Sequence, residues 1–297
     1  MLEALAKPST EELTLQKRES LWTKAWVKFK RDKIGLISFF VVAVYFTVAL
    51  LVWTGFIAQD WDEMMGASFS APTIEHWFGT NINGQDIFQR ATYSTKTAFE
   101  VGLTVAIFAT LVGAGFGCIT GYFSGSVLDE FILWIMNSID CIPYFLMVAA
   151  IAVAFDDSPY SMHFAMTLAF WTGTARVVRG EVIKLKSMEF VEAAHSLGVP
   201  TYRVIFKHLM PNTMHLLLVD MTLLFITAIK SEVILSFLGL GIKDSISWGL
   251  MISEASSDVT AGHFANFFAA SGLLFVLVLA FNLFSDSLQD ALDPRKV

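Results

Sequence analysis

The chain has 297 residues, of which 55% are hydrophobic and only 16% are charged. These proportions exclude an intrinsically disordered chain, and two cysteines are too few for a disulfide-stapled secreted fold. The formal net charge of −7 argues against a nucleic-acid-binding protein, which is usually basic. The composition instead predicts an all-α, polytopic membrane protein.

Six segments are apolar enough to be transmembrane helices, which need about 20 residues to cross the hydrocarbon core. They are residues 34–58, 101–128, 131–155, 158–175, 213–238 and 265–285. A long polar segment precedes the first span and no small-x-small cleavage pattern follows it, so we expect this span to stay in the mature protein. In the third span, Pro143 predicts a kink.

The distribution of basic residues predicts the orientation of these spans. With both termini in the cytoplasm, the cytoplasmic segments hold 16 Lys and Arg residues and the segments on the far side hold 3. Such a bias is the positive-inside pattern. The predicted organisation is a cytoplasmic N-terminal segment (1–33), a first transmembrane helix (34–58), a periplasmic loop (59–96), a five-helix transmembrane domain (97–290) and a cytoplasmic tail (291–297).

Glycines mark one face of the second span. Gly113, Gly117, Gly121 and Gly125 recur every four residues, which places them on the same side of a helix. Small residues in this pattern let a second helix approach closely within lipid. The phosphate-binding pattern G-x-x-x-x-G-K-[ST] occurs nowhere in the sequence, so the chain does not bind ATP by that device.

Four charged residues fall within the predicted spans, where a charge is costly and marks a functional site by default. Asp140 and Asp220 lie at a similar depth, about eight residues (12 Å) from the cytoplasmic side. One hypothesis is an intramembrane aspartyl protease, but the Gly-x-Gly-Asp sequence of such proteases is missing at both positions. The favoured alternative is structural, with each aspartate capping a helix or contacting a partner subunit. Lys230 and Glu232 are candidates for a substrate path; they do not face each other on a helix.

The segment 186–212 is predicted to form two short helices on the cytoplasmic side. The first covers about residues 186–197 and the second about residues 201–209. Their boundaries are set by Gly198 and Pro200 after the first helix, by Thr201 as N-cap of the second, and by Pro211 as its stop.

The same segment has the features of a docking surface. Ala193 and Ala194 are small and leave room for a partner. The second helix has an apolar side and a polar side, formed by Val204, Ile205 and Leu209 and by Arg203, Lys207 and His208, respectively. Spacing by itself also allows an ordinary solvated loop.

A longer motif in this segment resembles the EAA loop of ABC-importer permeases, whose pattern is EAA-x3-G-x9-I-x-L-P. The chain has Glu192-Ala193-Ala194-x3-Gly198-x9-His208-x-x-Pro211. It departs from the pattern at His208 and Met210. The peptide-importer branch often has His-x-Leu-Pro-Asn there, which His208 and Pro211-Asn212 resemble.

Further stretches are similar to the same family, from about residue 22 to residue 296. They are Trp26-x2-Phe29-x-Arg31-Asp32-Lys33-x-Gly35, residues 77–90, 232–241, 247–249 and 280–295. Within 77–90, Asn81 and Gln85 stand where the family pattern has Asp and Arg. The whole resembles the C-type permease subunit of dipeptide and oligopeptide ABC importers.

The resemblance implies a type I ABC importer permease fold, with residues 97–290 as the ABC transmembrane type-1 domain and 186–212 as its coupling loop. It implies a homologous B-type permease, two ATP-binding subunits and a periplasmic or extracellular peptide-binding protein as partners in the inner membrane. Glu192, Ala193, Ala194 and Gly198 would belong to the coupling helix. The chain itself would be no enzyme and would carry no cofactor.

Three alternatives remain at this stage. The same kind of importer could carry nickel or another small solute, although the six histidines are scattered with no ligand spacing such as H-x3-H. A stand-alone ion-coupled carrier could use Asp140, Asp220 and Glu232. The third alternative is the aspartyl protease.

Overall fold

The computed structural model describes residues 21–155, 158 and 160–293, and the regular elements in this part of the chain are helices. Two isolated β-bridges are its only other pairings, so the predicted all-α class is confirmed for the described residues. Residues 1–20 and 294–297 of the two predicted cytoplasmic ends lie outside them.

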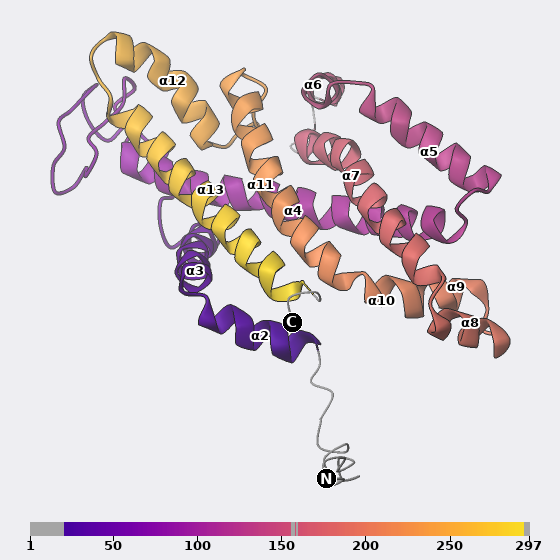
Figure 1. Cartoon of the computed structure of the whole chain (residues 1–297). Coiled ribbons are helices and arrows are strands. Elements are labelled where there is room, and N and C mark those ends of the chain that lie inside the picture. Colours follow the sequence, from indigo (N-terminus) through magenta and orange to yellow (C-terminus); the bar gives the residue numbers. More distant parts are fainter. Residues whose placement is uncertain (1–20, 156–157, 159, 294–297) are drawn as a thin grey trace, which may run out of the picture.

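The helices follow one another in a single bundle (Figure 1). They are α2 (Leu21–Arg31), α3 (Lys33–Trp53), α4 (Ile87–Tyr122), α5 (Val127–Asp140), α6 (Tyr144–Ala154), α7 (Ser161–Lys186), α8 (Glu189–Ser196), α9 (Thr201–Arg203), the π-helix η1 (Val204–Leu209), α10 (Met210–Asn212), α11 (Met214–Phe237), α12 (Trp248–Thr260) and α13 (Ala265–Leu292).

The long helix α4 is the centre of this bundle. It packs along α7 and also contacts α11 and α3, while α3 in turn packs against α13. In Figure 1, α4 runs behind α11 and α13 from the 54–86 segment to the end of α7 near α8. The largest apolar cluster joins α3, α4, α11, α12 and α13, with Phe99, Phe225 and Phe281 in mutual ring contact.

The glycine face predicted on the second span explains the close packing of α4 on α7. A Cβ atom added at Gly113, Gly117 or Gly121 would lie 2.6–2.7 Å from atoms of α7, a distance that no real side chain tolerates. The prediction is confirmed for these three positions. It is wrong for Gly125, because α4 ends at Tyr122 and Gly125 instead forms a turn with a positive φ of 82°.

The six predicted spans all fall on helices, but their lengths and polarity differ. Helices α3, α4 and α13 are each long and apolar enough to cross a membrane. Helices α5 and α6 meet this condition only as a pair, and they are bent by 86° at the break between them. The spans predicted at 158–175 and 213–238 lie in the more polar helices α7 and α11. The total of six spans and the cytoplasmic termini therefore stay predictions.

The kink predicted at Pro143 is a complete break. Helix α5 ends at Asp140, and Pro143 is the residue before α6, with φ −52° and ψ 120°. Proline lacks the N–H that would continue the helical hydrogen bonds, and its ring clashes with the preceding turn. The third span is therefore two helices rather than the single helix that the sequence predicted.

The junction of α2 and α3 is held by one carboxylate. Asp32 accepts a hydrogen bond from the Ile34 N–H (3.0 Å), which caps α3, and another from the Ser287 hydroxyl of α13 (2.6 Å). Gly35 is required here because a Cβ would lie 2.7 Å from the Ser287 Cβ. These hydrogen bonds, that of Ser287 first, lower the pKa of Asp32 below its ordinary value.

The segment 54–86 between α3 and α4 contains no helix. Its last residue, Asp86, accepts a hydrogen bond from the Gln89 N–H (3.0 Å) and so caps α4. Residues 87–96, predicted as part of the periplasmic loop 59–96, are therefore the first turns of α4.

Candidate functional site

The candidate docking site is a compact knob formed by residues 189–212. Helix α8 and the α9–η1–α10 run are joined by a turn at Gly198, whose φ of +70° favours glycine. This confirms the predicted pair of helices and the turn between them. The wider helical turns of η1 had no signal in the sequence.

Two predicted boundaries of the knob are wrong. Thr201 is the first residue of α9 rather than its cap; Pro200 holds the N-cap position and makes no side-chain bond. Pro211 does not stop the helical run, which continues through α10 to Asn212. Proline is tolerated in the first turn of a helix because its missing N–H has no helical partner there.

The inner side of the knob is apolar and anchors it to the long helices. Val204, Ile205 and Leu209 are buried as predicted, in a cluster with Val191 and with Ala194, which is 6% exposed. The same cluster includes residues of α4, α7 and α11. The knob is therefore packed against these three helices through one shared apolar cluster.

The two alanines of the motif have different environments. Ala194 lies in the buried cluster, whereas Ala193 and Glu192 are exposed beside it. The Glu192 carboxylate makes no hydrogen bond or ion pair with the described residues, whereas its backbone N–H donates to the Met188 carbonyl (3.4 Å). The outer side of the knob also exposes large apolar side chains, of which Leu197 is 83% exposed and Tyr202 59%. A free carboxylate surrounded by exposed apolar groups is suited to a protein partner.

Polar contacts fix the knob to the end of α4. The Tyr122 hydroxyl lies 3.3 Å from His195 Nε2 of α8. Lys186, at the end of α7, donates to the Tyr122 carbonyl (2.7 Å) and places its ammonium 5.3 Å from the Tyr122 ring centre. Of the other motif residues, His208 is half-buried and Pro211 is exposed. The His208 carbonyl accepts a hydrogen bond from the Asn212 side-chain amide (2.6 Å).

An ion pair that the sequence did not predict ties α5 to α7 near the knob. Arg179 binds the buried carboxylate of Asp129 with two nearly parallel hydrogen bonds of 2.9 and 2.8 Å. Such bidentate pairs fix direction as well as distance. No local pattern connects two residues that are 50 positions apart in the chain.

Asp140 and Asp220 do not meet. Asp140 accepts from Thr172 (2.7 Å) and pairs with Arg176, whereas Asp220 accepts from Thr174. Residues two apart on α7 point about 200° away from each other. The two carboxylates are therefore held on different sides of one helix and cannot share a proton, as an aspartyl protease requires.

Lys230 and Glu232 also lie in different environments, as their spacing predicted. Glu232 is 1% exposed and accepts a hydrogen bond from the Ser236 hydroxyl. Lys230 is exposed and makes no hydrogen bond or ion pair with the described part of the chain. Glu232 thus has a hydrogen-bond partner on its own helix, while the Lys230 side chain is open to a ligand or partner.

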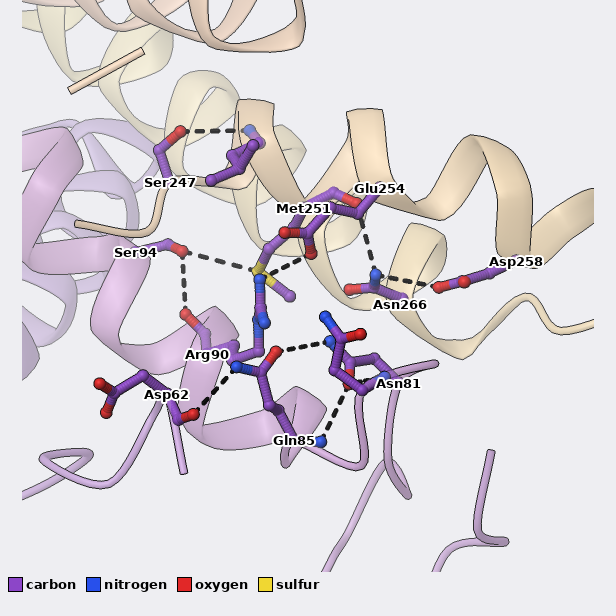
Figure 2. Close-up of polar contacts among 12 residues, drawn as sticks. Asp62, Asn81, Gln85, Arg90, Ser94, Ser247, Met251, Glu254, Asp258 and Asn266 are labelled. Atoms are coloured by element: carbon purple, nitrogen blue, oxygen red, sulfur yellow. Dashed lines mark hydrogen bonds and ion pairs between the residues drawn. The ribbon is translucent and has the colours of Figure 1, made fainter. Parts of the chain in front are cut away.

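The other end of α4 holds a buried polar cluster (Figure 2). Arg90, which is 2% exposed, donates to Glu254 of α12 (2.6 Å). Nearby, the Asn81 amide donates to the Gln85 side-chain oxygen (2.9 Å), and the Gln85 amide donates to the Asp62 carbonyl (3.0 Å). Asn81 and Gln85, the two departures from the family pattern, thus contact each other. Two neutral amides stand where the pattern has a pair of opposite charges.

No metal centre is formed by the described residues: they contain no group of three His, Cys, Asp or Glu side chains that could hold an ion. His76, the histidine of the segment before α4, is paired with Asp86 at 2.7 Å.

Comparison with known proteins identifies the family of the chain. Residues 113–297 match the family described as binding-protein-dependent transport system inner membrane component. The chain is also 34% identical, over 98% of its length and 95% of the relative's, to the oligopeptide transport system permease protein OppC of Bacillus subtilis (strain 168). The chain belongs to this family.

Two other relatives also match this chain over most of its length. The dipeptide transport system permease protein DppC of Bacillus subtilis (strain 168) is 34% identical over 98% of this chain and 92% of its own length. The glutathione transport system permease protein GsiD of Pectobacterium atrosepticum is 29% identical over 92% and 91%, respectively. The family that the EAA motif predicted is confirmed: the chain is a multi-pass inner-membrane transport component and not an enzyme.

Proposed function

We propose that this permease is one of two homologous permease subunits that together form the path for dipeptides and oligopeptides through an ATP-driven importer. The observation that carries the proposal is the 34% identity to OppC and DppC over 98% of the chain. The proposed orientation has six spans and cytoplasmic termini, in agreement with the charge bias.

The knob is the proposed docking site of an ATP-binding subunit. It lies on the side predicted to be cytoplasmic and presents a free carboxylate, Glu192, among exposed apolar side chains. Its buried side is continuous with α4, α7 and α11. A displacement of the knob by an ATPase would therefore be transmitted directly to three long helices, because packed interiors transmit strain.

The opposite end of the bundle is the proposed docking side of the peptide-binding protein. The segment 54–86 exposes apolar side chains and carries an acidic excess. The binding protein would select the peptide, and the switch between outward-open and inward-open states would follow from ATP binding.

The proposal is tested by reversing the charge on the knob. Glu192→Lys should abolish ATP-dependent uptake of a radiolabelled tripeptide in cells that lack other peptide importers, with the variant still inserted in the membrane. Glu130→Lys is the matched control, since Glu130 is an exposed acid in the first turn of α5, outside the knob. Unchanged uptake in Glu192→Lys would contradict the docking role, and absence of peptide uptake in the wild type would contradict the substrate.

A further inference from the structure

The four charged residues predicted within the spans differ in whether their side chains have hydrogen-bond partners. Asp140, Asp220 and Glu232 each hydrogen-bond to hydroxyl groups of the chain itself. Lys230 has no such partner among the described residues. A charged side chain within a membrane costs several kcal/mol unless it is paired or faces water. Of these four side chains, Lys230 is thus the one whose charge requires a partner, or water, from outside the described residues.

Lys230 lies on an exposed stripe of α11. Leu223, Thr227, Lys230 and Ile234 follow one another at helical spacing, and all four are exposed. Lys230 is seven residues before the end of α11 at Phe237, a rise of about 10 Å. Lys230 is therefore about two turns inside α11, on the side of the helix that the bundle leaves uncovered.

A groove of about 610 Å³ opens beside this stripe, between α11, α12 and α13. Its walls are mostly apolar, and its polar side chains include those of Lys230, Ser271 and Asn282. Asn282 donates its amide to the Val278 carbonyl (2.7 Å), which leaves its side-chain oxygen as an acceptor. The groove thus offers one cation, Lys230, and the acceptor oxygens of Asn282 and Ser271 on a mostly apolar surface.

We infer that Lys230 binds the terminal carboxylate of the peptide as it passes through the importer, with Asn282 accepting a hydrogen bond from a peptide N–H. The inference rests on the proposed peptide transport. It follows from charge: every unmodified linear peptide ends in a carboxylate, whereas its side chains vary. A single cation beside apolar walls holds that group and tolerates different residues next to it. An ion pair within the span would also remove the cost of the isolated ammonium.

The test replaces the cation and then restores it. Lys230→Met, within the assembled importer, should lower uptake of a free-acid tripeptide about 10-fold, the effect of losing one charge-assisted hydrogen bond. Uptake of the same tripeptide as its C-terminal amide should equal the wild-type rate for that amide. In a Lys230→Cys, Cys141→Ser variant, attachment of a methanethiosulfonate ethylammonium group should restore uptake of the free acid, whereas a methyl group should not. Cys118 is buried and stays in place.

Three results would overturn the inference. Unchanged uptake in Lys230→Met would show that the ammonium contacts no substrate. Loss of copurification with the second permease would assign Lys230 to an acidic group of that subunit instead. Equal losses for the free acid and the amide would show a role unrelated to the carboxylate. Failure of the proposed function is distinct from all three, because the wild type itself would then import neither peptide.

Discussion

The two ends of α4 are held in opposite ways. At its beginning, the 54–86 segment and α12 bury polar pairs, including Arg90 with Glu254 and Asn81 with Gln85. At its end, the knob is held mainly by apolar packing and leaves Leu197 and Tyr202 exposed. The first end satisfies its polar groups largely within the chain, whereas the second presents a surface to a partner. This difference predicts that mutations at the first end mainly change stability and that mutations on the knob mainly change assembly.

The largest effect is expected from breaking the Arg90–Glu254 pair. Glu254→Leu leaves the Arg90 guanidinium buried without its counter-ion, which should cost about 3 kcal/mol of unfolding free energy. The double variant Arg90→Met, Glu254→Leu removes both charges and should recover most of that loss. Thermal unfolding in detergent, followed by tryptophan fluorescence, measures both. A double variant that is less stable than Glu254→Leu would contradict the uncompensated charge as the cause.

The next largest effect on stability is expected at Ala194 but not at its neighbour Ala193. Ala194→Leu should destabilise the knob by about 2 kcal/mol, because the larger side chain overfills the buried cluster. Ala193→Leu should leave the unfolding midpoint unchanged, since Ala193 is exposed, but should reduce copurification with the ATP-binding subunit. The two variants add the same atoms to neighbouring residues and so control for each other. Equal effects on stability would remove the distinction between the two sides of the knob.

A smaller effect is expected where neutral amides stand in place of the family's charged residues. Asn81→Asp alone puts a charge at a buried position without a cation and should cost about 1–2 kcal/mol. Adding Gln85→Arg should return about 1 kcal/mol, because the two side chains already bond at 2.9 Å. A double-mutant cycle of unfolding free energies measures this coupling. Additive effects of the two substitutions would show that the positions act independently.

These pairs also show what could be predicted from the sequence. Apolar runs located the long helices. The spacing of Gly113, Gly117 and Gly121 predicted the close packing of α4, because the residues on one face of a helix can be recognised from their local spacing alone. Motif spacing located the knob. The Asn81–Gln85 contact had a signal, since both departures replace a charged residue and lie four positions apart.

The long-range contacts had no such signal. Arg90 and Glu254 are 164 positions apart, and Arg179 and Asp129 are 50 apart. Periodicity describes one helix at a time, whereas these contacts depend on how helices cross. Lys230 was predicted as one of four intramembrane candidates. That its side chain has no partner among the described residues, while the other three accept hydrogen bonds, could be seen only after the helices were assembled.

The smallest effect is expected at the start of α3, where one accessible carboxylate joins three helices. The pKa of Asp32 is lowered by the Ser287 hydroxyl and by backbone N–H groups, so its charged form stabilises the folded state. That contribution is complete above the ordinary aspartate pKa and is lost as the pH falls through the lower folded-state pKa. Asp32→Asn keeps one oxygen to accept from the Ile34 N–H, removes the charge and replaces the oxygen that accepts from Ser287 with an NH2 group, at a cost of about 0.5 kcal/mol after solvent screening. The difference between the unfolding midpoints of the two proteins should be constant from pH 7 down to about pH 4, shrink below that pH, and be smallest below the folded-state pKa of Asp32. A constant difference across that range would mean that the charge of Asp32 contributes nothing to stability. The loss would then come from the altered hydrogen bond to Ser287 alone.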